Sequence, residues 1–462
     1  MQADLNEPRA GPAEHPWSPA SWQEYPALQQ PAYSDPVALE QALKELAGLP
    51  PLVTSWEILA LRERLSDAAL GRGFILQAGD CAERFSECSS DRITNKLKIL
   101  LQMSLVLAHG AQCPIIRIGR FAGQYAKPRS SDLEERDGVS LPSYRGDIIN
   151  HPEFTPAARA ADPRLLIAGY ERAALTLNFI RALIKGGFAD LHHPEYWDLD
   201  WAQLSPMASQ YHRRIATIRD SLRFMENMFG VRAGETDTLD FYTSHEALHL
   251  GYEQSQTRRV PHKSGWFNLS THFPWIGIRT SASTGAHAEY LRGIENPIGV
   301  KVGKSTNLDD LLRLTAKLNP ANRPGRLTLI HRFGVETVEQ GLPKMVEALH
   351  REGLQVLWVC DPMHGNTRTT ASGYKTRSFD DIVAELRASF DIHESCGSRL
   401  GGTHIELTGE NVTECTGGAR GLREEDLAQA YETEVDPRLN YEQSLEIAMM
   451  LAGKLSSIRE KA

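Results

Sequence analysis

Four residues far apart in the sequence have side chains that could together bind a divalent metal ion. Cys81 offers a thiolate, His364 an imidazole, and Glu406 and Asp436 offer carboxylates. Such a mixture of soft and hard donors suits Mn²⁺, Fe²⁺, Co²⁺ or Zn²⁺ better than Ca²⁺ or Mg²⁺, and the donor types do not choose among the four. A bound ion of this kind can act as a Lewis acid, so these residues predict a metal-dependent enzyme.

A second set of residues is cationic and lies in or just after predicted strands. A buried lysine or arginine is costly unless an anion neutralises it, whereas a cation on a surface helix is an ordinary solvated charge. Several such residues at one barrel mouth indicate a site for phosphate or carboxylate groups, and arginine suits bidentate contacts. The set comprises Arg117, Arg120, Lys127, Arg129 and the neighbouring Ser130, followed by Arg279, Lys301, Arg332 and Lys375.

Short apolar segments must position these residues. FILQAGDCAE, QVLWVCDPMHGN and GGTHIELTGE each deliver one metal-binding side chain at or just past the end of a strand-like run, and Asp436 follows in the loop VDPRLN. In a parallel barrel the carboxyl ends of the strands carry the active site. We therefore expect these four residues to meet at one barrel mouth.

The whole chain shows eight strand-like segments separated mostly by helical patterns, which predicts an α/β fold of the (β/α)8 TIM-barrel type. The rival is an open doubly wound sheet, which would normally place a glycine-rich nucleotide loop after the first strand, and GDCAERFSE is not such a loop. The strand candidates are residues 74–80, 114–123, 238–248, 264–275, 297–303, 325–334, 354–362 and 401–409.

Two further regions decorate the predicted barrel. Residues 1–70 read as an N-terminal extension with helices, suited to oligomerisation or regulation, and residues 71–462 as the catalytic barrel. The stretch from about 121 to 237 is far longer than one crossover helix needs, so an inserted helical segment is expected at about 150–235. Its two helix candidates are residues 164–187 and 210–230.

Composition restricts the class of partner. The formal charge of −9 argues against nucleic acid or an anionic membrane as the main partner. No apolar run approaches the roughly 20 residues of a membrane span, and the N-terminus is too acidic and proline-rich for a signal peptide. Six cysteines in 462 residues are too sparse for a disulfide scaffold. These features predict a cytoplasmic enzyme with reduced thiols.

Long segments of the chain also resemble a known family. GDCAE, RIGRFAGQYAKPRS, SYRGDIIN, NPIGVKVG, PGRLTLIHRFG, CDPMHGNT, GGTHIELTGENVTEC and DPRLN are similar, in this order, to the signature segments of type II 3-deoxy-D-arabino-heptulosonate 7-phosphate (DAHP) synthases. The resemblance runs from about residue 17 to the C-terminus. It implies a barrel with an N-terminal extension and extra helices after the second strand. It also implies condensation of phosphoenolpyruvate with erythrose 4-phosphate, the first step of the shikimate pathway.

The resemblance implies roles for individual residues. Cys81, His364, Glu406 and Asp436 correspond to the metal ligands, with Mn²⁺ as first choice. Lys127 is expected to give a proton to the new hydroxyl group, while the group that handles the attacking water stays open between His364, Glu246 and a hydroxide on the metal. Contacts to phosphoenolpyruvate match Arg120, Arg279, Lys301 and Arg332; contacts to erythrose 4-phosphate match Lys127, Arg129 and Ser130; Trp275 and Lys375 complete the predicted substrate-binding set.

Two positions depart from the family pattern. In WIGIRTSASTGAH, Ile278 stands where the family has a glutamate and Thr284 where it has an aspartate. Loss of a charged group beside a metal site costs one to two orders of magnitude in activity, or it marks a changed substrate. Val435 replaces a cysteine that in some relatives can bridge to the metal-binding cysteine. Two alternatives therefore stand beside the main hypothesis: a specialised synthase for an amino or otherwise altered tetrose phosphate in secondary metabolism, and a weakly active regulatory or partner-binding paralogue.

The extension and the insertion offer apolar surface that a plain barrel does not need. In the resembled family such elements serve oligomerisation and feedback by aromatic amino acids, so we expect a homo-oligomer, dimer or tetramer, with an aromatic amino acid as effector. The alternative is that they simply cover the barrel. Aromatic residues are enriched at subunit interfaces. Those expected there are Trp17, Trp22, Tyr25 and Tyr33.

Overall fold

The structure, a computed structural model, describes residues 16–188 and 239–461, and between them only the single positions 209, 213, 216, 217 and 220. The second helix expected in the insertion, residues 210–230, therefore falls almost entirely outside the described residues. Within the described chain, every helix is too short or too polar to cross a membrane.

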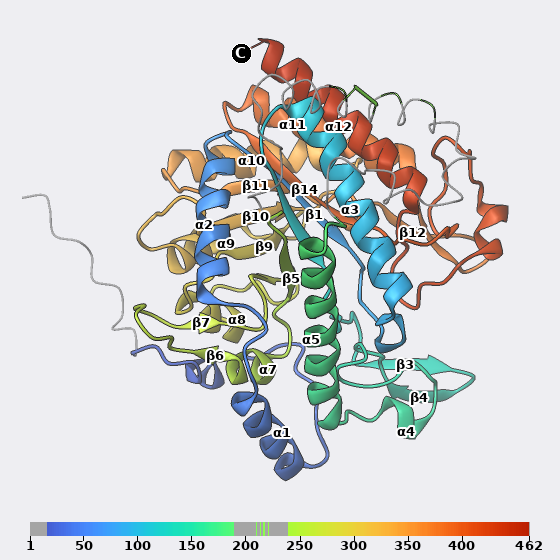
Figure 1. The fold of residues 1–462 in the computed structure, drawn as a ribbon. Coiled ribbons are helices and arrows are strands. Elements are labelled where there is room, and N and C mark those ends of the chain that lie inside the picture. The colour runs from blue at the N-terminus through green and yellow to red at the C-terminus, as the bar shows by residue number, and fades with distance from the viewer. Residues whose placement is uncertain are drawn as a thin grey trace, which may run out of the picture.

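Eight parallel strands close into a barrel in the order β1-β14-β11-β10-β9-β8-β5-β2 (Figure 1). All eight lie within or overlap the segments predicted from the sequence, and the (β/α)8 fold class is confirmed. The strands are β1 (Phe74–Gly79), β2 (Ile115–Arg120), β5 (Tyr242–Glu246), β8 (Phe273–Ile276), β9 (Ile298–Val302), β10 (Leu327–His331), β11 (Leu357–Cys360) and β14 (Leu400–Glu406).

The barrel interior changes from apolar to polar along the strands. An apolar cluster joins side chains of the strands to Leu61 and Leu65 of helix α2 (Ser55–Ala69), which packs against β1, β11 and β14. Toward the C-terminal ends the buried side chains are charged or polar, among them Gln77, Arg120 and Lys301. Because alternate residues of a strand face the interior, one apolar layer supports the polar layer above it.

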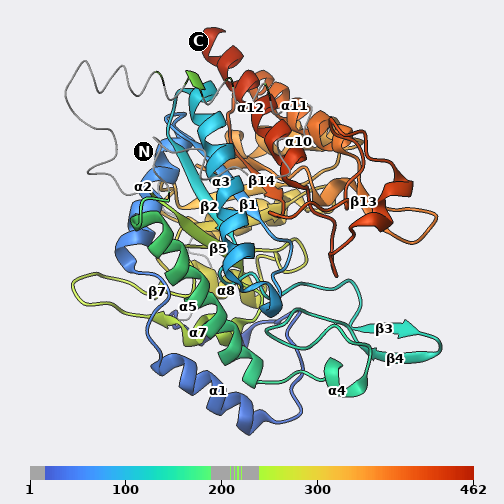
Figure 2. The ribbon, with the colours of Figure 1, turned by 45° about the vertical axis from the view of Figure 1, so that its right-hand side comes forward.

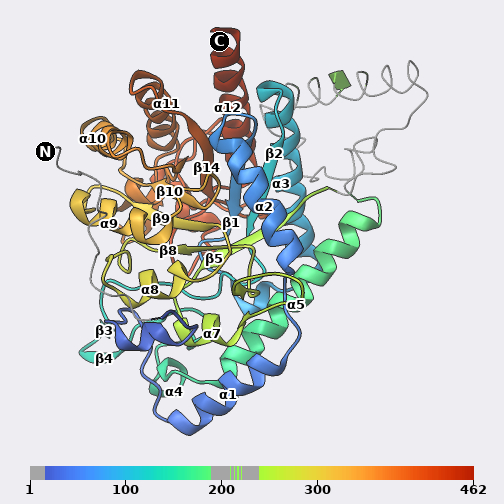
Figure 3. The ribbon, with the colours of Figure 1, turned by 90° about the vertical axis from the view of Figure 1, so that its left-hand side faces the viewer.

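Amphipathic helices cover the outside of the barrel, as Figures 2 and 3 show from two sides. Helix α9 illustrates why they form: Leu311, Leu314 and Leu318 recur at helical spacing and are buried, and the Asn307 side chain caps the first turn. The covering helices are α3 (Ser90–Ala111), α7 (Leu250–Ser255), α8 (Ala286–Arg292), α9 (Leu308–Leu318), α10 (Val338–Arg351), α11 (Phe379–Ser395) and α12 (Tyr441–Lys461).

The insertion between β2 and β5 begins with a hairpin that was not predicted from the sequence. Strands β3 (Leu133–Arg136) and β4 (Val139–Pro142) pair antiparallel around Asp137 and Gly138, whose φ angles are 50° and 77°. An Asp-Gly pair at positive φ is a strong hairpin signal. After the short helix α4 (Pro156–Arg159) comes α5 (Arg164–Lys185), the predicted first helix of the insertion, which packs against α1 (Pro36–Gly48) (Figure 1).

The segment 16–35, called the strap below, lies against α7 and α8 and contains the 3-10 helix η1 (Ser21–Glu24). The Trp17 indole N–H donates to the Glu289 carbonyl oxygen at 2.9 Å, and that of Trp22 donates to the Gln254 side chain at 2.8 Å. Contacts within the same chain therefore engage the aromatic residues that were expected at a subunit interface, namely Trp17, Trp22, Tyr25 and Tyr33.

Candidate active site

A cavity of about 370 Å³ opens at the C-terminal ends of the strands. The walls include the predicted site residues of the metal, substrate-binding and catalytic sets except Glu406, which is fully buried behind them. The predicted residues on the walls are Cys81, Arg120, Lys127, Arg129, Ser130, Glu246, Trp275, Arg279, Lys301, Arg332, His364, Lys375 and Asp436.

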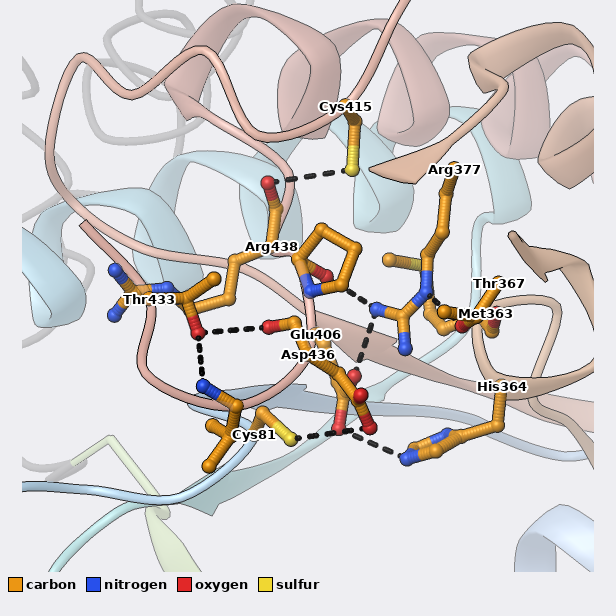
Figure 4. A network of polar contacts seen from close by, with 12 residues as sticks. Cys81, Met363, His364, Thr367, Arg377, Glu406, Cys415, Thr433, Asp436 and Arg438 are labelled. Atoms are coloured by element: carbon orange, nitrogen blue, oxygen red, sulfur yellow. Dashed lines mark hydrogen bonds and ion pairs between the residues drawn. The ribbon is translucent and has the colours of Figure 1, made fainter. Parts of the chain in front are cut away.

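The four predicted metal ligands lie together in this cavity. One donor atom of each residue lies within 4.8 Å of the others. The Cys81 thiol is 3.9 Å from Oδ2 of Asp436, and Nε2 of His364 is 3.0 Å from Oε1 of Glu406 (Figure 4). Residues from four separate segments thus point toward one position, as was expected from the sequence.

The motif GDCAE fixes Cys81 through its neighbours. Gly79 has a φ of 145°, and a Cβ atom there would lie 2.9 Å from the Arg120 carbonyl oxygen, so only glycine fits. The Asp80 carboxylate contacts the Lys96 ammonium group and accepts from Nη1 of Arg438 at 3.0 Å. The strand end that carries the thiol is therefore held by buried ion pairs on both sides.

Glu83, the last residue of the same motif, holds the loop after β2. Its carboxylate accepts the backbone N–H groups of Ala122, Gly123 and Gln124 at 2.9–3.1 Å. Burial raises the pKa of Glu83 to about 7, while Lys96 acts in the opposite direction. The motif thus positions both Cys81 and the segment that leads to Lys127.

Asp361 orients the His364 ring. Its Oδ2 atom lies 2.7 Å from Nδ1 of His364, which leaves Nε2 facing Glu406. Burial opposes ionisation of Asp361, but His364 and Lys301 hold its pKa well below the usual range. An ionised carboxylate behind an imidazole is the arrangement that fixes the ring of metal-binding histidines.

Both carboxylates of the predicted metal group have lowered pKa values and are therefore ionised at neutral pH. Glu406 accepts from Arg120 at 2.9 Å and from Arg377 at 2.7 Å. Against the effect of burial, His364 and these arginines hold the pKa of Glu406 well below its usual range. The pKa of Asp436 is also low despite burial, chiefly because of Lys127, whose ammonium group is 2.7 Å from Oδ2.

The pKa of the Cys81 thiol is shifted upward, in contrast to the lowered pKa values of the two carboxylates. Burial, together with the negative charge of Glu406, raises its pKa to about 12, although Lys127 acts against this. The Lys127 ammonium group lies 2.9 Å from Sγ and thus places positive charge between the thiol and Asp436. A divalent cation among these donors would offset the carboxylates and favour the thiolate, so the residues fit a metal ion.

Arg120 is held rigidly at the cavity floor. Its guanidinium donates to the carbonyl oxygens of Asp80 at 2.9 Å and Cys81 at 3.1 Å, and it lies 5.1 Å from the centre of the Trp275 ring. A further N–H contacts Nε2 of His404, whose pKa burial holds well below its usual value. Neutral His404 therefore accepts from Arg120, and only its other nitrogen can donate.

The remaining cations of the cavity have few carboxylate partners. Burial lowers the pKa of Lys301 to about 8, although Asp361 acts against this. Arg279 donates to Oγ of Ser130 at 2.9 Å and Arg332 to the His364 carbonyl oxygen at 3.1 Å. Among the ion pairs of the described residues neither arginine has a carboxylate partner. Positive charge of this kind fits an anionic ligand with phosphate or carboxylate groups.

Three predicted cations differ from this pattern. Arg129 donates to Glu134 of the β3–β4 hairpin at 2.6 Å, and Lys375 is 3.1 Å from Oδ1 of Asp436, so each already has a carboxylate partner. Arg117 does not line the cavity and instead donates to the carbonyl oxygen of Ile115. Arg117 lies three residues before Arg120, and two residues at an odd spacing in a strand have side chains on opposite faces. The prediction that Arg117 belongs to the anion site was therefore wrong.

Glu246 is a partly buried carboxyl group on the cavity wall, and one of its oxygen atoms is fully buried. Its Oε1 atom has no hydrogen-bond partner among the described residues. Burial raises the pKa of Glu246 to about 7, although Lys301 and Arg120 oppose this. Gly277 must lack a side chain because a Cβ atom there would meet this carboxylate. A carboxyl group that titrates near neutrality inside a cavity is suited to proton transfer.

Several residues that support the site were not predicted from the sequence. Asp361 had a usable signal, since it precedes His364 by three residues in DPMHGN. Arg377 lies at the end of the hairpin formed by β12 (Thr367–Thr369) and β13 (Lys375–Arg377), and no pattern distinguished it from a surface arginine. Gln77, which pairs with His404 at 2.8 Å, lay unnoticed inside the predicted first strand.

A second group of metal-capable residues lies between the barrel wall and α11. It consists of His331, Cys360 and Glu385, all buried. The Glu385 carboxylate already accepts the N–H groups of Phe333 and Gly334, both at 3.0 Å, and the Asn366 amide at 2.8 Å. These contacts give Glu385 a structural role, which is to hold the loops that carry Arg332 and His364.

Comparisons with known proteins place the sequence in one family. A family model described as the class-II DAHP synthetase family matches residues 17–452. A phospho-2-dehydro-3-deoxyheptonate aldolase of Neurospora crassa is 47% identical over 452 residues, with 94% of this chain and 94% of the relative covered. One of Streptomyces coelicolor is 46% identical over 432 residues, with 94% and 96% covered. A truncated 3-deoxy-D-arabino-heptulosonate 7-phosphate synthase from Thermotoga maritima is similar in structure at 12% identity with a TM-score of 0.34, covering 84% of this chain and 88% of that one.

Proposed function

The chain belongs to the class-II DAHP synthetase family, and we propose that its barrel mouth joins phosphoenolpyruvate, erythrose 4-phosphate and water to give DAHP and phosphate. This reaction is the first step of the shikimate pathway. The observation that carries the proposal is one cavity in which a four-donor metal group lies beside a cluster of arginine and lysine side chains. A reaction between two anionic substrates needs both features.

Phosphoenolpyruvate binds on the floor of the cavity. Arg120, Lys301 and Arg332 hold its phosphate and carboxylate groups, and Arg279 contributes from the rim. Arg120 is suited to this task because its backbone contacts and the Trp275 ring fix its orientation before the substrate arrives. The cations also screen the repulsion between the two phosphorylated substrates.

Erythrose 4-phosphate lies nearer the mouth. The segment from Lys127 to Ser130 meets its phosphate group through Arg129 and Ser130, and Lys375 lies on the opposite wall. In this position the aldehyde faces the metal ligands, because Lys127 contacts both Cys81 and Asp436. The two substrates are thereby brought together in one cavity with their reacting carbons adjacent.

The metal site is formed by Cys81, His364, Glu406 and Asp436. When bound there, a divalent ion polarises the aldehyde oxygen as a Lewis acid. Mn²⁺ is the first choice, and Co²⁺, Fe²⁺ and Zn²⁺ also suit the donor set.

The side chains then supply the proton transfers. As C3 of phosphoenolpyruvate attacks the aldehyde carbon, Lys127 gives a proton to the oxygen that becomes the new hydroxyl group. Water adds at C2, and Glu246 takes its proton. The hydroxyl group at C2 then gives its proton to the leaving phosphate oxygen as the bond from C2 to that oxygen breaks, which leaves a keto group and releases phosphate, stabilised by Arg332 and Lys301. His364 is held throughout by Asp361.

A second candidate function has one specific observation in its favour. Ile278 places an apolar side chain on the wall beside Arg279, and it also lines an adjoining cavity of about 220 Å³. An apolar group in place of the family glutamate changes the charge of this wall, and such a change is expected in a synthase that accepts an amino or otherwise altered tetrose phosphate. If the chain were instead a weakly active paralogue, an Ile278→Glu variant would be faster than the parent.

Assembly, effector and location belong to the same proposal. Val37 and Trp56 are 64% and 69% exposed, and Leu175 on α5 is 51% exposed. Exposed apolar residues of this size can form interaction surfaces, so we infer a homo-oligomer, dimer or tetramer. The proposed effector, an aromatic amino acid, follows from the family resemblance alone. The six free cysteines suit the reducing cytoplasm.

A steady-state assay of the metal-loaded full chain tests this function. We expect phosphoenolpyruvate to be consumed only when erythrose 4-phosphate is present, with one phosphate released per DAHP formed. Light scattering on the same preparation should give a multiple of the 51.4 kDa chain mass. Absence of turnover, or faster turnover with an amino-substituted tetrose phosphate, would overturn the main assignment, and a monomeric mass would overturn the inferred assembly.

A further inference from the structure

The strap is anchored to two parts of the barrel, the loop after β5 and the start of α8. The Gln30 amide donates to the Leu248 carbonyl oxygen at 2.7 Å and accepts the Leu250 N–H at 3.0 Å. The Pro26 carbonyl oxygen accepts the N–H of Ala286 at 3.1 Å. The strap is therefore fixed to the loop after β5 and to the start of α8, so the residues between these anchors have a defined position.

Gln29 lies between these anchors and reaches a different part of the molecule. Its side-chain amide donates to the Arg129 carbonyl oxygen at 3.1 Å and accepts the N–H of Arg129 at 2.8 Å. The same Oε1 atom accepts from Nη1 of Arg145 at 3.2 Å. The Arg145 carbonyl oxygen in turn accepts the backbone N–H of Lys127 at 2.9 Å. One side chain thus holds the segment 127–130 from two directions.

The backbone of Gln29 is held in an uncommon conformation. Its φ is 62°, in the left-handed region that residues with a side chain rarely adopt. Glycine would fit there without strain, yet the chain has a glutamine whose amide satisfies both polar groups of one peptide residue. Backbone conformations of this kind cost free energy and occur most often at functional sites, so the conformation of Gln29 points to a functional role.

The segment that Gln29 holds has little support of its own. Residues 121–132 contain no helix or strand. Ser130 is exposed and its Oγ atom accepts from Arg279 at 2.9 Å, while the Arg129 side chain is held by Glu134 at 2.6 Å, so these contacts involve side chains and not the backbone of the two residues. Lys127 is different, since its ammonium group is fixed directly by Cys81 and Asp436. The position of the Arg129 and Ser130 backbone therefore depends on Gln29 more than the position of the Lys127 ammonium group does.

We propose that Gln29 is a positioning residue for the sugar-phosphate half of the active site. It holds the peptide of Arg129 so that the segment 127–130 presents its polar groups to the phosphate of the tetrose before binding. The inference rests on the proposed binding of erythrose 4-phosphate to this segment. It assigns to the N-terminal strap an indirect part, through Arg129, in binding one substrate and not the other.

The test compares Gln29→Ala and Gln29→Gly with a control in the full metal-loaded chain. We expect either variant to raise the KM for erythrose 4-phosphate about tenfold, because two bonds to Arg129 and one to Arg145 are lost. The KM for phosphoenolpyruvate and kcat should stay within about twofold of the parent. Gln29→Gly removes the side chain and relieves the backbone strain, so folding defects cannot explain its effect. Gln23→Ala is the matched control, a glutamine of the same strap that contacts Gln254 and not the segment 127–130.

Calorimetric titration of each protein with erythrose 4-phosphate alone gives a second readout that does not need turnover. An about tenfold weaker Kd in both Gln29 variants, with parent-like binding in Gln23→Ala, supports the inference even if the condensation reaction is not observed. Parent-like KM and Kd for the tetrose phosphate in the Gln29 variants would overturn it. An equal loss in Gln23→Ala would also overturn it, since docking of the strap as a whole would then be responsible.

Discussion

Cys81 and Glu246 line the same cavity, and both have raised pKa values for different reasons. Burial raises both, but Cys81 also feels the negative charge of Glu406, whereas Glu246 faces the cations Lys301 and Arg120. The thiol is therefore converted to a thiolate only by a strong positive charge such as a metal ion. Glu246 titrates near neutral pH without a metal ion. The thiol of Cys81 is therefore suited to be a metal ligand, and the carboxylate of Glu246 is suited to accept a proton.

Glu246→Gln should change the pH dependence of the reaction. With a pKa of about 7, the Glu246 carboxyl group is largely protonated at about pH 6 and ionised at about pH 8. If the carboxylate accepts the proton of the attacking water, kcat of the parent rises with pH through about 7. The variant should be slower by about two orders of magnitude and should lack this rise. A parent-like pH profile in Glu246→Gln would assign the proton transfer to another group.

The same substitution should have a linked effect on stability. The folded-state pKa of Glu246 is raised above its unfolded value, so its favourable contribution is present below about pH 4.5 and is lost as the pH rises through about 7. A glutamine side chain at this position does not titrate, so its contribution to stability does not change over this pH range. The melting temperature of Glu246→Gln relative to the parent should therefore increase between about pH 5 and pH 8. A difference that stays constant over this range would show that the carboxyl group is not destabilised by burial.

At the scale of elements, the strands were the predictable part. Most barrel strands contain a short apolar run that ends at a glycine or a polar loop, and this local pattern, together with the alternation of strands and helices, located all eight, including the largely polar β5. The hairpin of β12 and β13 and the strap have no such pattern. Arg377 and Gln29 act through contacts that depend on where a loop folds back, so their sequence neighbourhoods gave no indication of their partners.

Helices α3 and α12 pack closely at Gly110, and this contact offers a test of the architecture. A Cβ atom at Gly110 would lie 2.7 Å from the Cα atom of Ala452. Overpacking costs about 1–3 kcal/mol, which exceeds the gain of about 1 kcal/mol in helix propensity. Gly110→Ala should therefore lower the free energy of unfolding by up to about 2 kcal/mol, measured by urea denaturation.

Gly453 provides the matched control for this prediction. It lies within α12 and is exposed, and a Cβ atom added there would have no other atom within 4 Å. Gly453→Ala should therefore stabilise the protein by up to about 1 kcal/mol. Equal stabilisation by both substitutions would contradict the close packing of α3 against α12.

At the scale of the whole molecule, closure of the barrel creates the site. Cys81 follows the first barrel strand and Glu406 ends the last, and β1 pairs with β14 so that Gly79 lies opposite Glu406. Residues at the two ends of the sheet therefore become neighbours only in the closed fold. The four predicted metal ligands could be grouped from the sequence because each lies at or after a strand end, or in a segment that resembles the DAHP synthase family. The second layer of contacts, such as Asp361 with Lys301, depends on strand register and required the structure.

The central claim is that Cys81, His364, Glu406 and Asp436 hold the metal ion on which the condensation depends. The most direct measurement is turnover of the metal-stripped protein as Mn²⁺ is added, with bound metal determined at each point. We expect no turnover without metal and full turnover at one bound ion per chain. The Cys81→Ala variant should lose both metal binding and turnover. Full turnover by the stripped protein, or parent-like metal binding by Cys81→Ala, would contradict it.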